Sequence, residues 1–323
     1  MSARTQNVTV RYGDTVAVSD LSLEIGTGER FAIMGPSGSG KSTLLRAIAG
    51  LEPLASGSIY IDGIDVTGLP PHRRPVGLMF QDYALFPHMT VVDNVAYGLK
   101  MQGASTAVAR EGASLLLERA GLTGFEHRTP TSLSGGERQR VALVRTLARE
   151  PSLVMLDEPL GSLDLALRES LLEQMRMIVS RVGATSLYVT HDRTEAFAFA
   201  QRLAIMREGS VIRVGTPDEV WNDPGTTFIA RFIGHPNVVP GPSIGINAEA
   251  VTISPDAIVI DQDGAIRGSV ADAVFIDGSY ELAVRLPDGI VLKVRSAEPS
   301  TAGTETRLNV DVSRARELSV DKV

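Results

Sequence analysis

Residues 35–43 read GPSGSGKST and decide the fold, because they fit the pattern G-x-x-x-x-G-K-[ST]. An alternating apolar and polar stretch precedes them and the helix-like run LLRAIAGL follows, so strand, loop and helix come in the order that a phosphate-binding loop requires. The glycines allow consecutive backbone N–H groups to point at one phosphate. The stretch therefore predicts an α/β domain that binds a nucleotide.

Two side chains of this loop have predicted roles of their own. Lys41 is expected to reach the β- and γ-phosphates, and the hydroxyl of Ser42 is expected to ligate Mg²⁺. An ordinary Gly/Ser loop is the alternative interpretation, and the flanking strand and helix argue against it. The other loop positions that we predict to bind the nucleotide are Gly35, Pro36, Ser37, Gly38, Ser39, Gly40 and Thr43.

Polar residues stand directly after three short apolar runs that have the composition of buried parallel strands. Because open α/β sheets bind ligands at the carboxyl ends of their strands, we expect these residues to meet at one edge. They are Gln81 after VGLMF (76–80), Asp157 and Glu158 after LVML (153–156), and His191 after SLYVT (186–190).

Each of these residues has a predicted role and an ordinary alternative. Asp157 suits Mg²⁺, held directly or through water, and Glu158 is better placed to polarise a water that attacks the γ-phosphate. His191 is expected either to donate a hydrogen bond to the γ-phosphate or to hold Glu158 and the water in place; Gln81 is expected to ligate Mg²⁺ or bind the water. Without the phosphate loop upstream, each residue would have an ordinary interpretation. Asp157-Glu158 would start a helix, His191 would cap one, and Gln81 would be a glutamine at the end of a strand with no special role.

A second candidate for phosphate binding lies far from the first in the sequence. Residues 133–140 read LSGGERQR, in which a serine and two glycines precede a charged run that can start a helix. Backbone N–H groups at the N-terminus of a helix bind anions. One chain therefore carries two devices for holding phosphate.

Composition limits the class of protein. The 323 residues, 43% of them apolar, suffice for one large domain or two of ordinary size. No run approaches the roughly 18 apolar residues of a membrane span, and the start MSARTQNVTV lacks the apolar stretch of a signal peptide, so we expect a cytoplasmic chain unless a partner tethers it. Zero cysteines exclude disulfides and thiolate metal sites, and a net charge of −7 disfavours nucleic-acid binding.

A change in amino-acid composition marks the predicted domain boundary. Residues 234–246, GHPNVVPGPSIGI, are rich in glycine and proline, and only β-like sequence follows. Asp-Gly turn pairs at 277–278 and 288–289 suggest a small barrel there. We therefore predict an α/β ATP-binding domain over residues 1–235 and an all-β domain over residues 236–323.

Two subdomains are expected within the first domain. The residues before the phosphate loop alternate around Tyr12-Gly13-Asp14, which predicts antiparallel strands joined by a tight turn. Residues from about 92 to 150 are mainly helical in pattern and predict a helical subdomain.

The motifs together resemble one family. In chain order they are GPSGSGKST, Gln81, LSGGERQR, LVMLDE, Ser162-Leu163-Asp164 and His191. This order resembles the ATPase subunit of an ABC transporter over about residues 5–235, and LSGGERQR is its most specific mark because other phosphate-loop ATPases lack it. The resemblance implies ATP and Mg²⁺ as cofactors and ATP hydrolysis as the activity. It also implies that Asp164 belongs to the nucleotide site and that Tyr12 stacks on adenine, for which a plain hairpin tyrosine is the alternative.

The same resemblance accounts for the two phosphate devices. It implies a head-to-tail homodimer, or a pair with another ABC subunit, in which one ATP lies between Lys41 of one copy and residues Ser134, Gly135 and Gly136 of the other. Closure then depends on the charge of the γ-phosphate, and hydrolysis opens the pair. That motion can do work on an attached protein.

Two further stretches resemble the importer branch of the family. QDYALFPHMTVVDNVAYGL and the β-rich tail are similar to subunits that take up iron, polyamines, inorganic anions or sugars, whose C-terminal extension is a small OB-like regulatory barrel. This implies a peripheral protein on the cytoplasmic face of the membrane that drives solute import through separate transmembrane subunits, with a solute-binding protein as an indirect partner. A helix of a membrane subunit is expected to contact Tyr83, Phe86, Pro87 and Met89, although such side chains also fill local cores.

Two positions depart from the family's usual pattern. Two other functions are considered after them as alternatives to solute import. Gly161-Ser162 stands where Ser followed by Asn or Ala is common, and Asn247-Ala248 replaces a common Arg-Pro, which weakens any inference about the tail. A soluble ABC ATPase acting on nucleic acid or ribosomes would show a coiled-coil insertion, two ATPase halves or a basic surplus. An export-type subunit would be fused to membrane spans or lack the β-rich tail.

Overall fold

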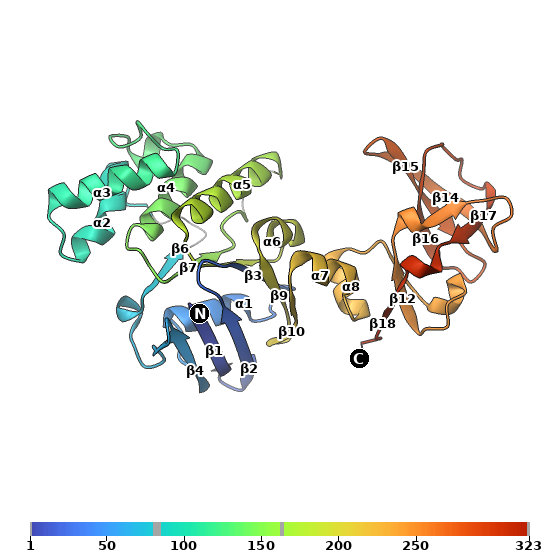
Figure 1. Ribbon diagram of the computed structural model, residues 1–323, viewed down its shortest axis with the longest axis horizontal. Coiled ribbons are helices and arrows are strands. Elements are labelled where there is room, and N and C mark those ends of the chain that lie inside the picture. The colour runs from blue at the N-terminus through green and yellow to red at the C-terminus, as the bar shows by residue number, and fades with distance from the viewer. Residues whose placement is uncertain (1, 80–84, 162–164, 322–323) are drawn as a thin grey trace. The chain divides into compact units, whose positions relative to one another are not determined.

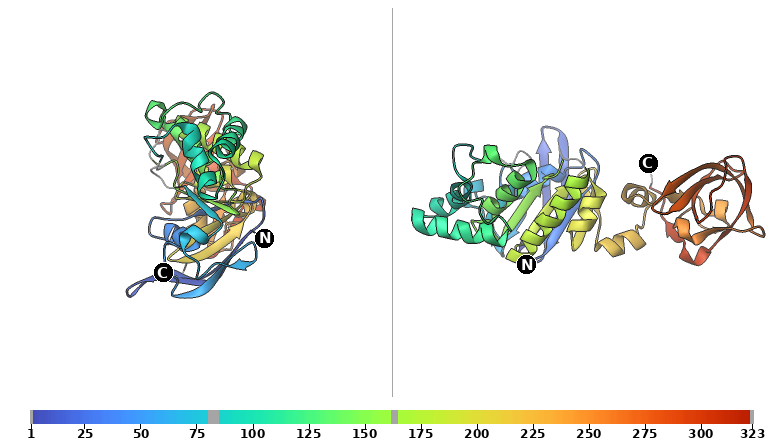
Figure 2. Two further views of the ribbon diagram at one scale, coloured as in Figure 1. Left: turned by 90° about the vertical axis from the view of Figure 1, so that its left-hand side faces the viewer. Right: turned by 90° about the horizontal axis from the view of Figure 1, so that it is seen from above.

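The computed structural model describes residues 2–79, 85–161 and 165–321 (Figures 1 and 2). Contacts between Cα atoms divide the chain into two compact units, Met1–Pro217 and Asp218–Val323, which are called the first and the second unit here. The predicted domain boundary at residue 235 falls inside the second unit, and the extent of the functional domains stays a prediction.

The first unit is built on a six-stranded sheet. Its strands are β3 (Arg30–Met34), β6 (Val76–Met79), β7 (Leu153–Asp157), β8 (Ser186–Thr190), β9 (Arg202–Arg207) and β10 (Ser210–Gly215). Their order is β10-β9-β3-β8-β7-β6; the pairs from β9 to β6 are parallel, and β10 is antiparallel to β9. The apolar side chains of β7 and β8 are all buried, as their near-continuous apolar runs predict.

The register of this sheet brings the ends of three strands together. β3 pairs with β8 so that Met34 lies opposite Thr190, and β7 pairs with β8 so that Asp157 lies opposite Val189. The residues that follow each strand therefore leave the sheet at one carboxyl edge, where ligands bind in open α/β sheets.

The first unit also contains an antiparallel sheet of order β2-β1-β4-β5. Its strands are β1 (Ala3–Tyr12), β2 (Thr15–Ile25), β4 (Ser56–Ile61) and β5 (Ile64–Asp65). Gly13, in the turn between β1 and β2, has a left-handed φ of 57°, which suits a tight hairpin. The antiparallel strands predicted around this turn are thus confirmed.

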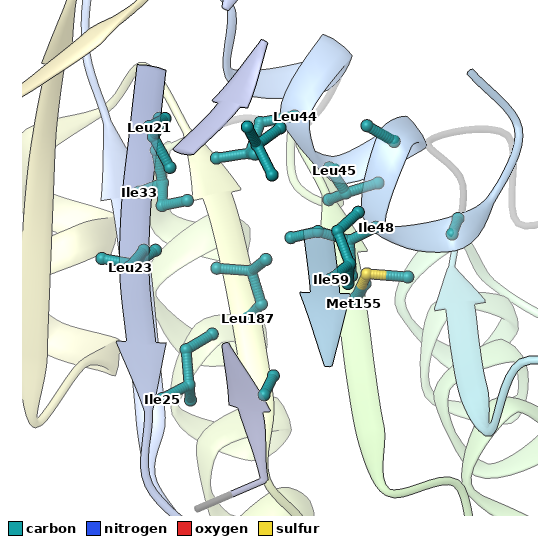
Figure 3. Packing of buried hydrophobic residues seen from close by; sticks show 14 of the residues in the cluster. Leu21, Leu23, Ile25, Ile33, Leu44, Leu45, Ile48, Ile59, Met155 and Leu187 are labelled. Carbon is teal, nitrogen blue, oxygen red and sulfur yellow. The ribbon is translucent and has the colours of Figure 1, made fainter. Parts of the chain in front are cut away.

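One hydrophobic cluster joins both sheets to helix α1 (Lys41–Ala49) (Figure 3). Leu44, Leu45 and Ile48 of this helix are at most 2% exposed. They share the cluster with Ile59 of β4, Met155 of β7 and other buried side chains of the two sheets. Burial of each large apolar side chain stabilises the fold by about 1.5–3 kcal/mol. The helix that follows the phosphate loop is thereby held against both sheets.

The other helices of the first unit are α2 (Val91–Met101), α3 (Thr106–Arg119), α4 (Gly135–Leu147), α5 (Leu165–Val182) and α6 (Arg193–Phe199), with short 3₁₀ turns at Pro71–Arg73 and Pro130–Ser132. Hydroxyl side chains cap the first three, since Thr90, Ser105 and Ser134 each accept a hydrogen bond from a backbone N–H of the first turn. Across residues 2–79, 85–161 and 165–321, no helix has both the length and the apolar character needed to cross a membrane.

The second unit is mainly β-structure. Helix α7 (Pro217–Asn222) begins at its boundary, and α8 (Thr227–Ile233) lies within it before the first strand. The first of its two antiparallel sheets has the order β11-β12-β18, with strands β11 (Asn237–Val239), β12 (Ala250–Ile253) and β18 (Arg316–Leu318). The second has the order β13-β17-β14-β15-β16, with strands β13 (Ile258–Ile260), β14 (Ile266–Ile276), β15 (Ser279–Arg285), β16 (Val291–Ser296) and β17 (Glu305–Val310). Turns at both predicted Asp-Gly pairs join β14 to β15 and β15 to β16.

Candidate functional site

The phosphate loop leads from β3 into α1, and two of its glycines are fixed by close backbone contacts. A Cβ atom on Gly35 would lie 2.2 Å from the carbonyl oxygen of Met206, and one on Gly40 would lie 2.3 Å from that of Ala17. Gly40 also has a φ of +96°, a conformation that other residues rarely adopt. Because only glycine fits at these positions, the loop can follow the tight course that a cradle of N–H groups requires.

Lys41 places its ammonium group inside this loop. The residue is 5% exposed, and Nζ donates hydrogen bonds to the carbonyl oxygens of Gly35 (2.9 Å) and Pro36 (2.8 Å). Burial lowers the pKa of Lys41, while the neighbouring carboxylates of Glu158 and Asp157 act in the opposite direction. The ammonium group can exchange these neutral acceptors for phosphate oxygens, with which its hydrogen bonds are stronger.

Asp157, at the end of β7, lies beside the first turn of α1. The hydroxyl of Ser42 donates a hydrogen bond of 3.1 Å to Oδ1 of Asp157, although the two residues are 115 positions apart in the sequence. Burial raises the pKa of Asp157, and the hydrogen bond from Ser42 opposes that rise. A hydroxyl and a carboxylate oxygen side by side form a donor set that suits Mg²⁺, so these residues fit the predicted metal site.

Glu158 and His191 form the next pair along this edge. Glu158 has a left-handed φ of +43°, uncommon for a residue with a side chain, and its N–H donates to the carbonyl oxygen of Val189 (3.0 Å). Its Oε2 lies 3.2 Å from Nδ1 of His191. His191 thus stands where it can orient Glu158, one of its two predicted actions, and the catalytic roles of both residues stay predictions.

The other predicted nucleotide residues vary in exposure. Ser37 and Gly38 are exposed in the middle of the loop, Ser39 is buried, and Thr43 is half-buried in the first turn of α1. Tyr12, at the end of β1, is 47% exposed, and its predicted stacking on adenine stays a prediction.

The stretch LSGGERQR starts α4 with a capping box. Oγ of Ser134 accepts a hydrogen bond from the N–H of Glu137 (3.3 Å), and the Glu137 carboxylate accepts one from the N–H of Ser134 (2.7 Å). Ser134 is exposed, whereas a Cβ on Gly136 would lie 2.7 Å from Cδ2 of Leu171. Among the described residues, no hydrogen bond joins residues 134–136 to the phosphate loop of the same chain.

Three residues with predicted roles, Gln81, Tyr83 and Asp164, lie outside the described residues.

Phe86 and Met89 are half-buried, and Pro87 is exposed. The ring of Phe86 lies 4.9 Å from that of Tyr97, measured between centroids. The turn at residues 86–90 therefore shows apolar atoms at the surface while Phe86 also packs locally.

Sequence reasoning missed two buried side-chain amides: Asn94, which holds the turn at residues 86–90, and Gln139, which contacts the chain just after Glu158. Oδ1 of Asn94 accepts a hydrogen bond from the N–H of Phe86 (2.8 Å), and its Nδ2 donates to the carbonyl oxygens of Phe86, Met89 and Thr90. Nε2 of Gln139 donates to the carbonyl oxygen of Pro159 (3.2 Å), the residue after Glu158. An amide within a predicted apolar helix face was the available signal, because a buried amide needs partners.

Comparison with known proteins identifies the family. Residues 18–161 match the family described as ABC transporter. The chain is 41% identical over 335 residues to the Fe(3+) ions import ATP-binding protein FbpC of Rhizobium etli, with 94% of this chain and 95% of that protein covered. The chain belongs to the ABC transporter ATPases. This confirms the predicted family and its activity, ATP hydrolysis.

Other relatives of this ABC ATPase agree. It is 39% identical over 320 residues to the spermidine/putrescine import ATP-binding protein PotA of Rubrobacter xylanophilus, with 90% of this chain and 85% of that protein covered. Both relatives are named as import proteins, so the predicted resemblance to the importer branch is confirmed. A solved structure of the ATP-binding cassette MJ0796, a dimer bound to ADP and Pi, has a TM-score of 0.57 and 33% identity, and covers 67% of this chain and 98% of that one.

Two substitutions in the ABC phosphate loop test the cradle. We expect Gly40→Ala to weaken ATP binding by more than about tenfold, because the methyl group would meet a backbone oxygen and the φ is unfavourable. Gly38→Ala is the matched variant, because it has a φ of +78° and nothing within 4 Å of the added atom. Titration with a fluorescent ATP analogue should find a much smaller loss for Gly38→Ala, and equal losses would contradict the steric account.

Proposed function

We propose that this chain is the ATP-hydrolysing subunit of an importer and acts as a head-to-tail pair on membrane subunits. The convergence of Lys41, Ser42, Asp157, Glu158 and His191 at one edge of the six-stranded sheet carries the proposal. These side chains come from three segments that are distant in the sequence, and their chemistry matches the parts of a phosphoryl-transfer site.

Ser42 and Asp157 would hold Mg²⁺ next to the phosphates. Bound there, the metal supplies charge neutralisation on the β- and γ-phosphate oxygens. The oxygens of the two side chains already lie 3.1 Å apart, so both face the same point beside the loop. Lys41 adds a second cation from the loop itself.

Glu158 acts on the water that attacks the γ-phosphate. Its carboxylate accepts a hydrogen bond from this water and so orients it. Nδ1 of His191, which lies beside Oε2 of Glu158, holds the carboxylate in position. The backbone bond from Glu158 to Val189 keeps the carboxylate at the end of the sheet. Positioning of this kind supplies much of the catalysis in phosphoryl transfer.

The second phosphate device completes the site from a partner copy. Ser134 is exposed at the start of α4, and the first N–H groups of a helix point out of its N-terminus, as an anion site requires. The relative MJ0796 was solved as a dimer bound to ADP and Pi, which supports a paired arrangement. A site completed by two copies makes closure depend on the nucleotide.

Glu158→Gln separates binding from hydrolysis. The amide keeps the size of the side chain but is a poor base, so we expect turnover to fall by about a hundredfold or more while ATP still binds. The variant should accumulate as an ATP-bound dimer in size-exclusion chromatography with ATP and Mg²⁺. Glu111→Gln is the control, because this exposed carboxylate lies on α3, which contributes none of the residues of the proposed site. Near-normal hydrolysis by Glu158→Gln would remove the residue from its proposed role.

Two disabled chains test whether the site is shared. Lys41→Ala removes the phosphate cation, and Ser134→Asp places a carboxylate near the phosphate position while Asp still caps α4. Each homodimer should be inactive, whereas a mixed dimer contains one site with both changes and one intact site. Mixing should therefore restore labelled-ATP binding and part of the hydrolysis.

The outcome depends on pairing, which tag exchange between the two chains measures independently. If heterodimers form and neither signal returns, the two motifs do not share one ATP. The Ser134→Asp change is preferable to a side chain at Gly136, because Gly136 has no room against Leu171 and its replacement would disturb α4 and α5.

We further assign the membrane contact to the turn at residues 86–90 and an OB-like regulatory barrel to residues 236–323.

The relatives are named for import of Fe(3+) ions and of spermidine/putrescine. These names support uptake through separate transmembrane subunits at the cytoplasmic face, with a solute-binding protein as an indirect partner. The five antiparallel strands of the larger sheet in the second unit, with β13 in contact with β16, suit an OB-like barrel.

Phe86→Ser combined with Met89→Ser tests the membrane contact. We expect ATP binding to persist, because the phosphate loop is untouched, while co-purification of an integral membrane protein from detergent-solubilised membranes is lost. Met101→Ser is the control, since Met101 is 66% exposed at the end of α2. A collapse of the thermal midpoint in the double variant would show that Phe86 and Met89 are core residues instead.

A further inference from the structure

The hydroxyl of Thr190 links the backbone of Asp192 to the side chain of Glu195. Thr190 is 1% exposed at the end of β8, and its Oγ1 donates a hydrogen bond of 2.6 Å to Oε2 of Glu195. The same oxygen accepts the N–H of Asp192 at 2.9 Å. A hydroxyl has one proton to donate, so these two contacts fix its orientation. His191 lies between Thr190 and Asp192, and its backbone is therefore held from both sides.

A buried carboxylate anchors this bridge. Glu195 is 5% exposed, and its Oε2 also accepts a hydrogen bond of 3.0 Å from the hydroxyl of Tyr188. Two hydroxyl donors therefore converge on one oxygen. Arg168 of α5 lies over the group, with Nη1 3.3 Å from Oδ2 of Asp192 and Nε 3.8 Å from Oε1 of Glu195. Such a network is rigid when its members are satisfied.

The side chain of His191 has little else to position it. Its side chain is 56% exposed, and its polar contact within the described part of the chain is the one to Glu158. The direction of the imidazole therefore depends on the backbone at residue 191. A small rotation there would lengthen the 3.2 Å contact between Nδ1 and the Glu158 carboxylate.

We propose that Thr190, braced by Glu195, is a positioning residue for hydrolysis that acts through His191. Because its side chain is 1% exposed, Thr190 acts through its neighbours and not by direct contact with the reactants. The inference rests on the proposed function, because it assumes that His191 and Glu158 serve ATP hydrolysis. The alternative is that Thr190 only seals the end of a buried strand, in which case its hydroxyl contributes to stability and not to turnover.

Thr190→Val removes the hydroxyl and keeps the shape of the side chain. We expect kcat for ATP to fall about tenfold, the effect of losing one buried hydrogen bond that positions a catalytic group. KM and the affinity for ADP should not change, because the phosphate loop is untouched. Thr190→Ser restores the hydroxyl and should recover most of the rate. Should the valine prevent folding, Thr190→Ala removes the hydroxyl without added bulk and carries the same expectation.

Thr185→Val is the matched control. Thr185 is 4% exposed and precedes β8 at its other end, where its Oγ1 accepts the N–H of Gly28 at 2.9 Å. This change also removes a buried hydroxyl, far from His191, so it should lower the thermal midpoint without changing kcat. Equal losses of kcat in Thr185→Val and Thr190→Val would overturn the inference.

A double variant tests whether Thr190 acts through His191. In the His191→Ala background, Thr190→Val should cause no further loss in single-turnover hydrolysis, because the group it positions is gone. A full second loss, or a Thr190→Ser variant as slow as Thr190→Val, would overturn the inference. Wild-type chain without ATPase activity would instead overturn the proposed function, so the two failures are distinguishable.

Discussion

Parallel pairing of β3, β8 and β7 is the constraint on which the site depends. The strands have near-continuous apolar runs and are buried, so packing on both faces fixes their register. With Met34 opposite Thr190 and Asp157 opposite Val189, the phosphate loop, His191 and Glu158 leave the sheet as neighbours. A slip of one residue in β8 would turn its side chains to the other face and separate His191 from Glu158. The geometry of the candidate site is therefore a consequence of apolar packing several residues away.

Two charged side chains, Lys41 and Asp157, are partly buried at this edge of the sheet. Burial lowers the pKa of Lys41 and raises that of Asp157, so the protein environment disfavours the charged form of each. A phosphate beside Lys41 and a divalent cation beside Asp157 would each favour the charged form again. Lys41 and Ser42, which donates to Asp157, are consecutive residues in the first turn of α1, so a single metal–phosphate ligand bound there would satisfy both groups at once. A neutral ligand of the same size would leave both groups disfavoured, which gives the site selectivity for charge as well as shape.

The site residues at the carboxyl ends of the parallel strands could be predicted from the sequence, because a local pattern and the general topology of open α/β sheets are enough to locate them. An apolar run followed by Asp157-Glu158, for example, places two carboxylates at the edge of a sheet. The hairpins of the second unit were equally accessible, since Asp-Gly pairs have strong turn preferences. Thr190 and Glu195 could not be found in this way. Their partners are set by tertiary contacts, and a buried threonine at a strand end has no local signal that separates a hydroxyl bridge from ordinary packing.

The anion site proposed at the N-terminus of α4 contains an acidic residue. Glu137 belongs to the capping box, and its pKa is lowered first by the hydrogen bond from the Ser134 N–H and further by Arg128 and Arg140. Its negative charge would by itself oppose a phosphate at the same helix end. Arg128 lies 3.6 Å from the Glu137 carboxylate and offsets that charge, while the helix N-terminus contributes partial positive charge. If a partner copy brings a phosphate to this helix end, as proposed, Arg128 would offset the repulsion from Glu137, whose observed contacts fix the start of the helix.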